Sequence, residues 1–238
     1  MALVVWDPIT GDQQHLPLPG YPHAYCTGAV LCAAAGCDHL DCRGGPFKVV
    51  FVGTDDVEGV TWASEYSSEI GAWSASTTVD SDSYVEMRPS LLAGDALYFT
   101  LESNLRVLKY DLGGRVLSVI DAPRVPGGIV MTAEGGGLGF AGVEDYSLYL
   151  WSWEAGPEPE GIAGWVQCRV TELDKLLPFP AISVSLDVIG FAEGTDIISM
   201  STDVGGLHNQ AQIRTGEEGR RLRGLLHHRT LHELLHSR

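Results

Sequence analysis

The sequence predicts an all-β protein, and three observations lead to that prediction. Short apolar runs recur along the chain, and most of them alternate apolar with polar residues, as half-buried strands do. Turn-forming residues separate these runs, and the 29 Gly residues favour turns over helices. With 45% hydrophobic and 19% charged residues, the chain has the composition of a folded domain.

The expected strands follow one another from the N-terminus to residue 202. Each combines β-branched or aromatic residues with apolar alternation, the composition that suits a pleated and partly buried surface. They lie at Leu3–Trp6, Phe47–Gly53, Gly59–Tyr66, Ala96–Glu102, Arg106–Asp111, Arg115–Ile120, Gly128–Ala133, Leu138–Val143, Ser147–Glu154, Gly164–Val170, Leu186–Ala192 and Asp196–Thr202.

The opening stretch VVWDPITGD contains an aspartate that could be catalytic or structural. Asp7 ends a strand, and Gly11 closes the turn that follows. A second stretch, LKYDLGGR, places Asp111 and Gly114 in a similar pattern. An aspartate in this position can accept hydrogen bonds from backbone N–H groups two residues further on, which holds the turn. The motif recurs without the partners of a catalytic carboxylate, so we interpret these four residues as structural turn residues.

Looser copies of this turn occur at Ser67, Glu154 and Thr215. Repeats of roughly 40 to 50 residues with several strands each are typical of a β-propeller, whose blades are twisted sheets stacked on one another. We therefore predict a β-propeller-like domain over residues 1–218. It would be incomplete, with about four blades or slightly more.

The last segment, residues 219–238, differs from the rest of the chain. It is basic and rich in histidine, and Leu226, Thr230 and Leu234 recur at a helical spacing, so we expect a short helical tail. A loosely docked tail is the preferred interpretation, and a docking helix or basic contact site is the alternative. Four histidines of this tail could also bind a metal adventitiously: His227, His228, His232 and His236.

Charge and cysteine content limit the function classes. The net charge is −16, and so acidic a chain repels phosphate backbones, which excludes general nucleic-acid binding. No apolar run is long enough to cross a bilayer, and the N-terminus lacks the basic start of a signal peptide. Five cysteines, an odd number, favour a reducing compartment, so we expect a cytoplasmic or nuclear protein with no membrane partner.

One cluster of residues could hold a metal. Cys32, Cys37 and Cys42 are each separated by four residues, and His39 lies among them, a loose match to zinc-ligand spacing. No second cysteine pair follows at a distance, as a zinc ribbon would have. Free thiols in a strand and a loop are therefore the preferred interpretation, and structural zinc is the alternative.

Other motifs do not indicate catalysis. Gly137, Gly139 and Gly142 match a dinucleotide-binding pattern, but an alternating strand follows them instead of a helix, so a hairpin is favoured. The sequence has no serine-hydrolase elbow, H-E-x-x-H motif or Walker loop. Tryptophans such as Trp62 and Trp151 could line a recognition face, but their strand positions favour packing. We expect no cofactor and no enzymatic activity, with a propeller hydrolase as a minor alternative.

Several ordered blocks resemble a known family. They include VVWDPITGDQQHLPLP, AGCDHLDCRGGPFKVVFVGT, WASEYSSEIGAWS, LLAGDALYFTLE, LGFAGVEDYSLYLWSWE and DVIGFAEGTDIISMSTDVGGL. From Leu3 to Leu207 the chain resembles the F-box-associated β-propeller domain of plant F-box proteins, particularly those of grasses, but lacks the N-terminal F-box.

The resemblance implies a non-catalytic domain that binds proteins. Such domains present degradation targets to Skp–cullin–F-box ubiquitin ligases, while the F-box binds the Skp-type adaptor. We expect an adaptor partner only if an F-box precedes this chain, and the protein target is not indicated. The alternative is a stand-alone interaction or decoy module that recruits no ligase.

Overall fold

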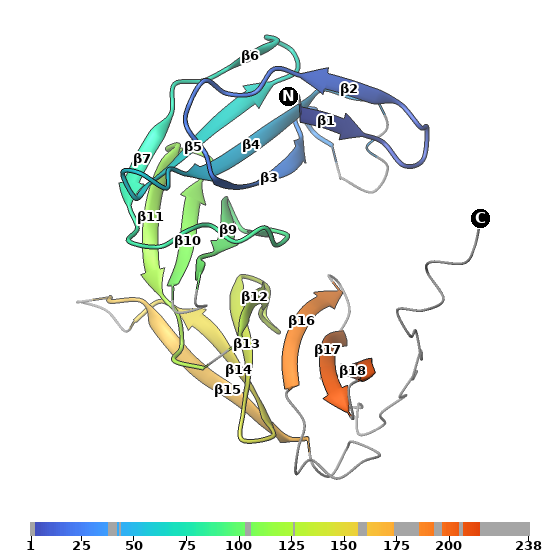
Figure 1. Ribbon diagram of the computed structural model, residues 1–238, viewed down its shortest axis with the longest axis vertical. Coiled ribbons are helices and arrows are strands. Elements are labelled where there is room, and N and C mark those ends of the chain that lie inside the picture. Colours follow the sequence, from blue (N-terminus) through green and yellow to red (C-terminus); the bar gives the residue numbers. More distant parts are fainter. Residues whose placement is uncertain are drawn as a thin grey trace. The chain divides into compact units, whose positions relative to one another are not determined.

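The computed structural model describes residues 3–37, 42, 44–102, 106–125, 127–156, 161–173, 186–192, 197–204 and 207–214 (Figure 1). This part of the chain contains eighteen strands and no α-helix, and the strands form several antiparallel sheets. The prediction of an all-β protein is therefore confirmed. The expected helical tail at 219–238 lies outside the described residues and stays a prediction. Within them, no helix is long and apolar enough to span a membrane.

The chain divides into two compact units. Unit 1 comprises Met1–Glu102 and Leu108–Ile120, and unit 2 comprises Ser103–Val107 and Asp121–Arg238.

Unit 1 contains two whole sheets and nearly all of a third, of which only the first two residues of β10 and the last residue of β11 belong to unit 2. A two-stranded sheet pairs β1 with β2, a five-stranded sheet has the order β3-β4-β5-β6 with β7 also paired to β5, and a four-stranded sheet has the order β8-β9-β10-β11. The strands are β1 (Leu3–Trp6), β2 (Gln13–Leu16), β3 (Tyr25–Cys32), β4 (Phe47–Thr54), β5 (Val60–Ser67), β6 (Ala72–Trp73), β7 (Thr77–Asp80), β8 (Leu91–Ala93), β9 (Ala96–Thr100), β10 (Arg106–Asp111) and β11 (Val116–Asp121).

Strand β4 is buried on both faces, because neighbouring sheets cover it from two sides. Successive side chains of a strand point to opposite faces. Val50 and Val52 belong to a core cluster with residues of the β8–β11 sheet, including Leu97, Phe99 and Leu108. On the opposite face, Val49 packs with Leu16 of β2 and Tyr66 of β5. The part VVFVG of this strand is therefore a continuous apolar run rather than an alternating one.

Three buried hydroxyl groups of unit 1 pair with one another. Thr61 Oγ1 lies 2.9 Å from Thr54 Oγ1 and 2.8 Å from Ser81 Oγ, and all three residues are fully buried. Thr54 Oγ1 also accepts a hydrogen bond of 3.1 Å from the backbone N–H of Val85. Because an unpaired buried hydroxyl is costly, this chain of hydrogen bonds fixes β4 and β5 against the segment that precedes β8.

Unit 2 contains two sheets, with the orders β12-β13-β14-β15 and β16-β17-β18. One buried cluster joins them: Ala141 and Leu148 of the first sheet share it with Val188, Ile198 and Met200 of the second. The strands are β12 (Ile129–Thr132), β13 (Leu138–Glu144), β14 (Ser147–Glu154), β15 (Gly164–Glu172), β16 (Leu186–Ala192), β17 (Ile197–Val204) and β18 (Leu207–Arg214).

Candidate functional site

The structure places Asp7 in the turn between β1 and β2. Its Oδ1 accepts hydrogen bonds from the backbone N–H groups of Ile9 (2.8 Å) and Thr10 (3.4 Å). The Gly11 N–H donates to the Asp7 carbonyl at 2.8 Å, and Gly11 has a φ of +80°, which a residue without Cβ adopts readily. The Asp7 carboxylate therefore accepts the backbone hydrogen bonds that hold this turn.

Asp111 holds the turn between β10 and β11 by a variation on this arrangement. Its Oδ1 accepts a 2.6 Å hydrogen bond from the Gly114 N–H. The left-handed conformation falls on Arg115, whose φ is +54°, and not on Gly114. A Cβ on Gly114 would lie only 3.1 Å from Asp111 Oδ1, so glycine leaves room for the carboxylate here.

Asp55 holds a third aspartate turn, which was not predicted from the sequence. Asp55 Oδ1 accepts from the Val57 N–H at 2.9 Å, and the Gly59 N–H donates to the Asp55 carbonyl at 3.0 Å. Gly59 has a φ of +68°. This turn joins β4 to β5 within one sheet. The aspartate motif is therefore a feature of hairpin turns in general, and it does not mark one fixed position in each sequence repeat.

The structure brings together three of the four candidate metal ligands. Cys32 ends β3, and Cys37 and Cys42 lie in the connection to β4. Their Sγ atoms all lie within 4.8 Å of one another, and those of Cys37 and Cys42 are 3.3 Å apart. The hydrogen bond to Cys37 and the proximity of Cys32 raise the pKa of Cys42 to about 12. His39 lies outside the described residues.

A hollow of about 620 Å³ lies in unit 1, and we call it the unit 1 hollow. Three apolar residues on its wall are exposed: Trp6 of β1 (58%), Val30 of β3 (55%) and Leu92 of β8 (47%). Asp7 and Asp12 add carboxyl groups to the same wall. Its remaining lining residues are Val5, Gln14, Leu31, Cys32, Cys42, Gly44, Gly45, Pro46, Phe47, Gly94 and Leu112.

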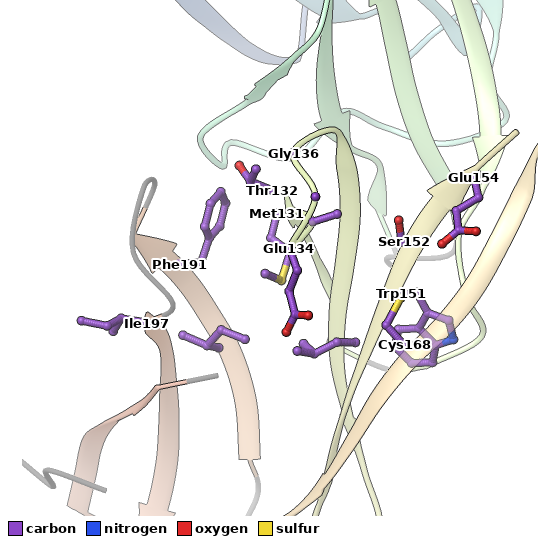
Figure 2. A pocket seen from close by; sticks show the side chains of 14 residues that line it. Met131, Thr132, Glu134, Gly136, Trp151, Ser152, Glu154, Cys168, Phe191 and Ile197 are labelled. Carbon is purple, nitrogen blue, oxygen red and sulfur yellow. The ribbon is translucent and has the colours of Figure 1, made fainter. Parts of the chain in front are cut away.

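A smaller hollow of about 470 Å³ lies within unit 2. Figure 2 shows Met131 and Glu134 between Phe191 of β16 and Trp151 of β14. The Glu134 carboxylate pairs with Arg169 Nη2 at 2.7 Å, and its side chain is 56% exposed. Glu134 is therefore an ion-paired carboxylate at the surface of unit 2.

The glycine-rich stretch forms a hairpin. Gly136 and Gly137 have φ values of +79° and +91° in the turn that joins β12 to β13. Gly139 and Gly142 lie within β13, where a Cβ would come within 3.0 Å of the Ala133 nitrogen and 2.7 Å of a Val125 methyl, respectively. The strand β14 follows directly, so close packing accounts for these glycines.

The tryptophans divide between packing and exposure. Trp62 is 3% exposed, and its indole N–H donates to the Pro22 carbonyl at 2.7 Å. Trp153 packs edge-to-face on Trp165 across β14 and β15, with ring centroids 5.1 Å apart. Trp6 is the exception, since it lies largely exposed in the unit 1 hollow. The expected packing role thus fits Trp62, Trp153 and Trp165, whereas most of the Trp6 side chain is exposed.

No protein-family model matches the chain, and no curated protein matches it. The likeness to F-box-associated domains thus stays a prediction based on the sequence blocks. The unit 1 hollow is the strongest candidate for a recognition site, because it combines an exposed tryptophan with aliphatic side chains from three sheets.

Proposed function

We propose that this chain is a non-catalytic protein-interaction domain of the β-propeller type. The observation that carries the proposal is the unit 1 hollow, whose wall exposes an apolar anchor set of Trp6, Val30 and Leu92. Tryptophan dominates the energetics of many protein interfaces because it buries a large area with few rotatable bonds.

The sheet arrangement supports a propeller-type scaffold. Consecutive strands form four-stranded meanders, β8–β11 in unit 1 and β12–β15 in unit 2. In unit 1, β4 is covered on both faces by other sheets, as expected of a blade between two neighbours. A rigid scaffold of this type holds its loops in fixed positions, which lowers the entropic cost of binding.

The chemistry of the hollow indicates the type of target. Apolar side chains line most of it, and Asp7 and Asp12 add carboxyl groups to its wall. The chain as a whole carries a net charge of −16. A target segment with one or two large apolar side chains flanked by Lys or Arg would complement both properties. By its sequence likeness, the role would be recognition of targets for ubiquitylation.

A capture experiment with matched variants tests the proposal. The purified full chain serves as bait in an extract of its source organism, and bound proteins are quantified by mass spectrometry. Val30 lies in the hollow and Val57 outside it, and both are exposed, at 55% and 86%. We expect specific partners to bind the wild type and Val57→Ser, but to be lost with Val30→Ser and Trp6→Ser. Partners that bind Val30→Ser and Trp6→Ser as well as they bind the wild type would contradict the proposed site.

A second arm addresses the ligase. Binding of a purified Skp-type adaptor to the chain would support the role of a ligase receptor. Target binding without adaptor binding would support a stand-alone or decoy module. Turnover of any glycoside in a broad substrate panel would contradict the non-catalytic assignment.

A further inference from the structure

Three cysteines of unit 1 meet although they come from different parts of a hairpin. Cys32 is the last residue of β3, while Cys37 and Cys42 belong to the connection before β4 begins at Phe47. The Ala33 N–H donates to the Pro46 carbonyl at 2.8 Å, which closes the base of this connection. The Cys37 N–H reaches the Ala34 carbonyl at 3.4 Å, so the chain turns back towards Cys32.

The spacing of the three sulfurs suits a metal ion. Zn–S bonds of about 2.3 Å at a tetrahedral angle hold sulfur atoms about 3.8 Å apart. The three Sγ atoms lie within 4.8 Å of one another, and those of Cys37 and Cys42 are 3.3 Å apart. Small rotations of the side chains would bring all three to bonding distance of one ion.

Simple packing does not account for the cluster. A cysteine that only fills space is usually among the most buried residues of a protein. Here Cys32 and Cys37 are half-buried and Cys42 is exposed. A disulfide would occupy two sulfurs and leave the convergence of the third without a role. Soft thiolate ligands are those that select Zn²⁺ and similar ions.

We propose that Cys32, Cys37 and Cys42 form a binding site for one thiophilic metal ion, and that Zn²⁺ is the ion that fits best. The three thiol protons pass to solvent as the ion binds, and each sulfur donates an electron pair without change of oxidation state. Three protein ligands leave one position of a tetrahedral ion for a further ligand. The bound ion would fix the connection between β3 and β4. This inference rests on the thiols and goes beyond the proposed function, although Cys32 and Cys42 also line the unit 1 hollow.

Metal titration of the full chain tests the proposal. The protein is prepared metal-free under a non-chelating phosphine reductant, titrated with Zn²⁺ against a chromophoric chelator, and analysed for bound metal. We expect one equivalent to bind tightly, and Cys32→Ser, Cys37→Ser or Cys42→Ser to weaken binding roughly 100-fold or more. Cys26→Ser and Cys168→Ser are the matched controls, and we expect them to leave the affinity unchanged.

Two further measurements separate this site from the histidine-rich tail. Co²⁺ substitution should give thiolate-to-metal charge-transfer absorption, which imidazole ligands do not produce. Zn²⁺ should also protect three of the five thiols from alkylation in the wild-type chain, a readout that needs no variant. Retention of tight binding in the three cysteine variants, its loss on replacing the tail histidines by glutamine, or metal-independent alkylation of all five thiols would overturn the proposal.

Discussion

Glu65 is a buried acid with two cationic partners, and its neutralisation can be tested by a double-mutant cycle. Its side chain is 3% exposed, and its Oε1 lies 3.1 Å from both Lys48 Nζ and Arg115 Nη2. The Lys48 and Arg115 side chains are 40% and 55% exposed, so both cations stay partly hydrated. The carboxylate is thus the desolvated member of the network, and either cation alone can neutralise it.

This asymmetry predicts strongly non-additive effects. Lys48→Met or Arg115→Met alone should lower the free energy of unfolding by only about 0.5–1 kcal/mol, because the remaining cation still pairs with the carboxylate. The double substitution leaves a buried charge without a partner, for which we expect a loss of about 3–5 kcal/mol. The coupling between the two sites, which is the double loss minus the two single losses, should therefore reach about 1–4 kcal/mol.

Urea unfolding followed by tryptophan fluorescence measures these losses, and hydrogen exchange of peptides from β4 and β5 reports whether they arise locally. Lys109→Met is the control, since it removes one positive charge from unit 1 without touching this network. Additive losses in the double variant, within about 0.5 kcal/mol, would refute the claim that the carboxylate depends on either cation.

Three further predictions concern other parts of unit 1. Thr61→Val should lower the free energy of unfolding by about 1–3 kcal/mol, because the buried hydroxyl groups of Thr54 and Ser81 lose the partner they share. Equilibrium unfolding measures this loss, with Thr61→Ser as the control. Gly53→Ala should lower the free energy of unfolding by about 1–3 kcal/mol, since its Cβ would lie 2.8 Å from an indole carbon of Trp62. Thermal unfolding measures this, with Gly20→Ala as a control that should be neutral because its Cβ meets no atom within 4 Å. Burial raises the pKa of Tyr98 and Tyr110, so their stabilisation is present below the unfolded pKa of about 10 and lost as the pH rises through the folded pKa. Tyr98→Phe and Tyr110→Phe should each flatten this alkaline loss in urea titrations, and an unchanged slope would contradict the role of burial.

The strands that could be predicted from the sequence are those rich in aromatic and β-branched side chains. Ser147–Glu154 and Leu186–Ala192 coincide with the expected ranges, because aromatic and β-branched residues fill them. Strand β2 (Gln13–Leu16) was missed, since three of its four residues are polar and exposed. Strand β3 was missed because Gly28 breaks its pattern. A Cβ there would lie 3.0 Å from the Val50 carbonyl oxygen, a constraint set by the neighbouring strand.

The candidate sites were predictable to different extents. Cysteine spacing alone nominated Cys32, Cys37 and Cys42, and the turn between β3 and β4 brings their sulfurs together. The unit 1 hollow could not be predicted, because Trp6, Val30 and Leu92 come from strands of three different sheets. The sequence does not show which residues of different sheets lie side by side, because this depends on how the sheets pack.

The cover that β1 and β2 place over β4 has a consequence for solubility. Leu16 and its neighbours shield Val49, which lies in FKVVFVG, a stretch with high β-propensity, one charge and no proline. Detachment of this small hairpin would bare one face of that stretch while the other sheets remain folded. On warming, soluble protein should then be lost by self-association of partly opened molecules, well below the temperature of global unfolding.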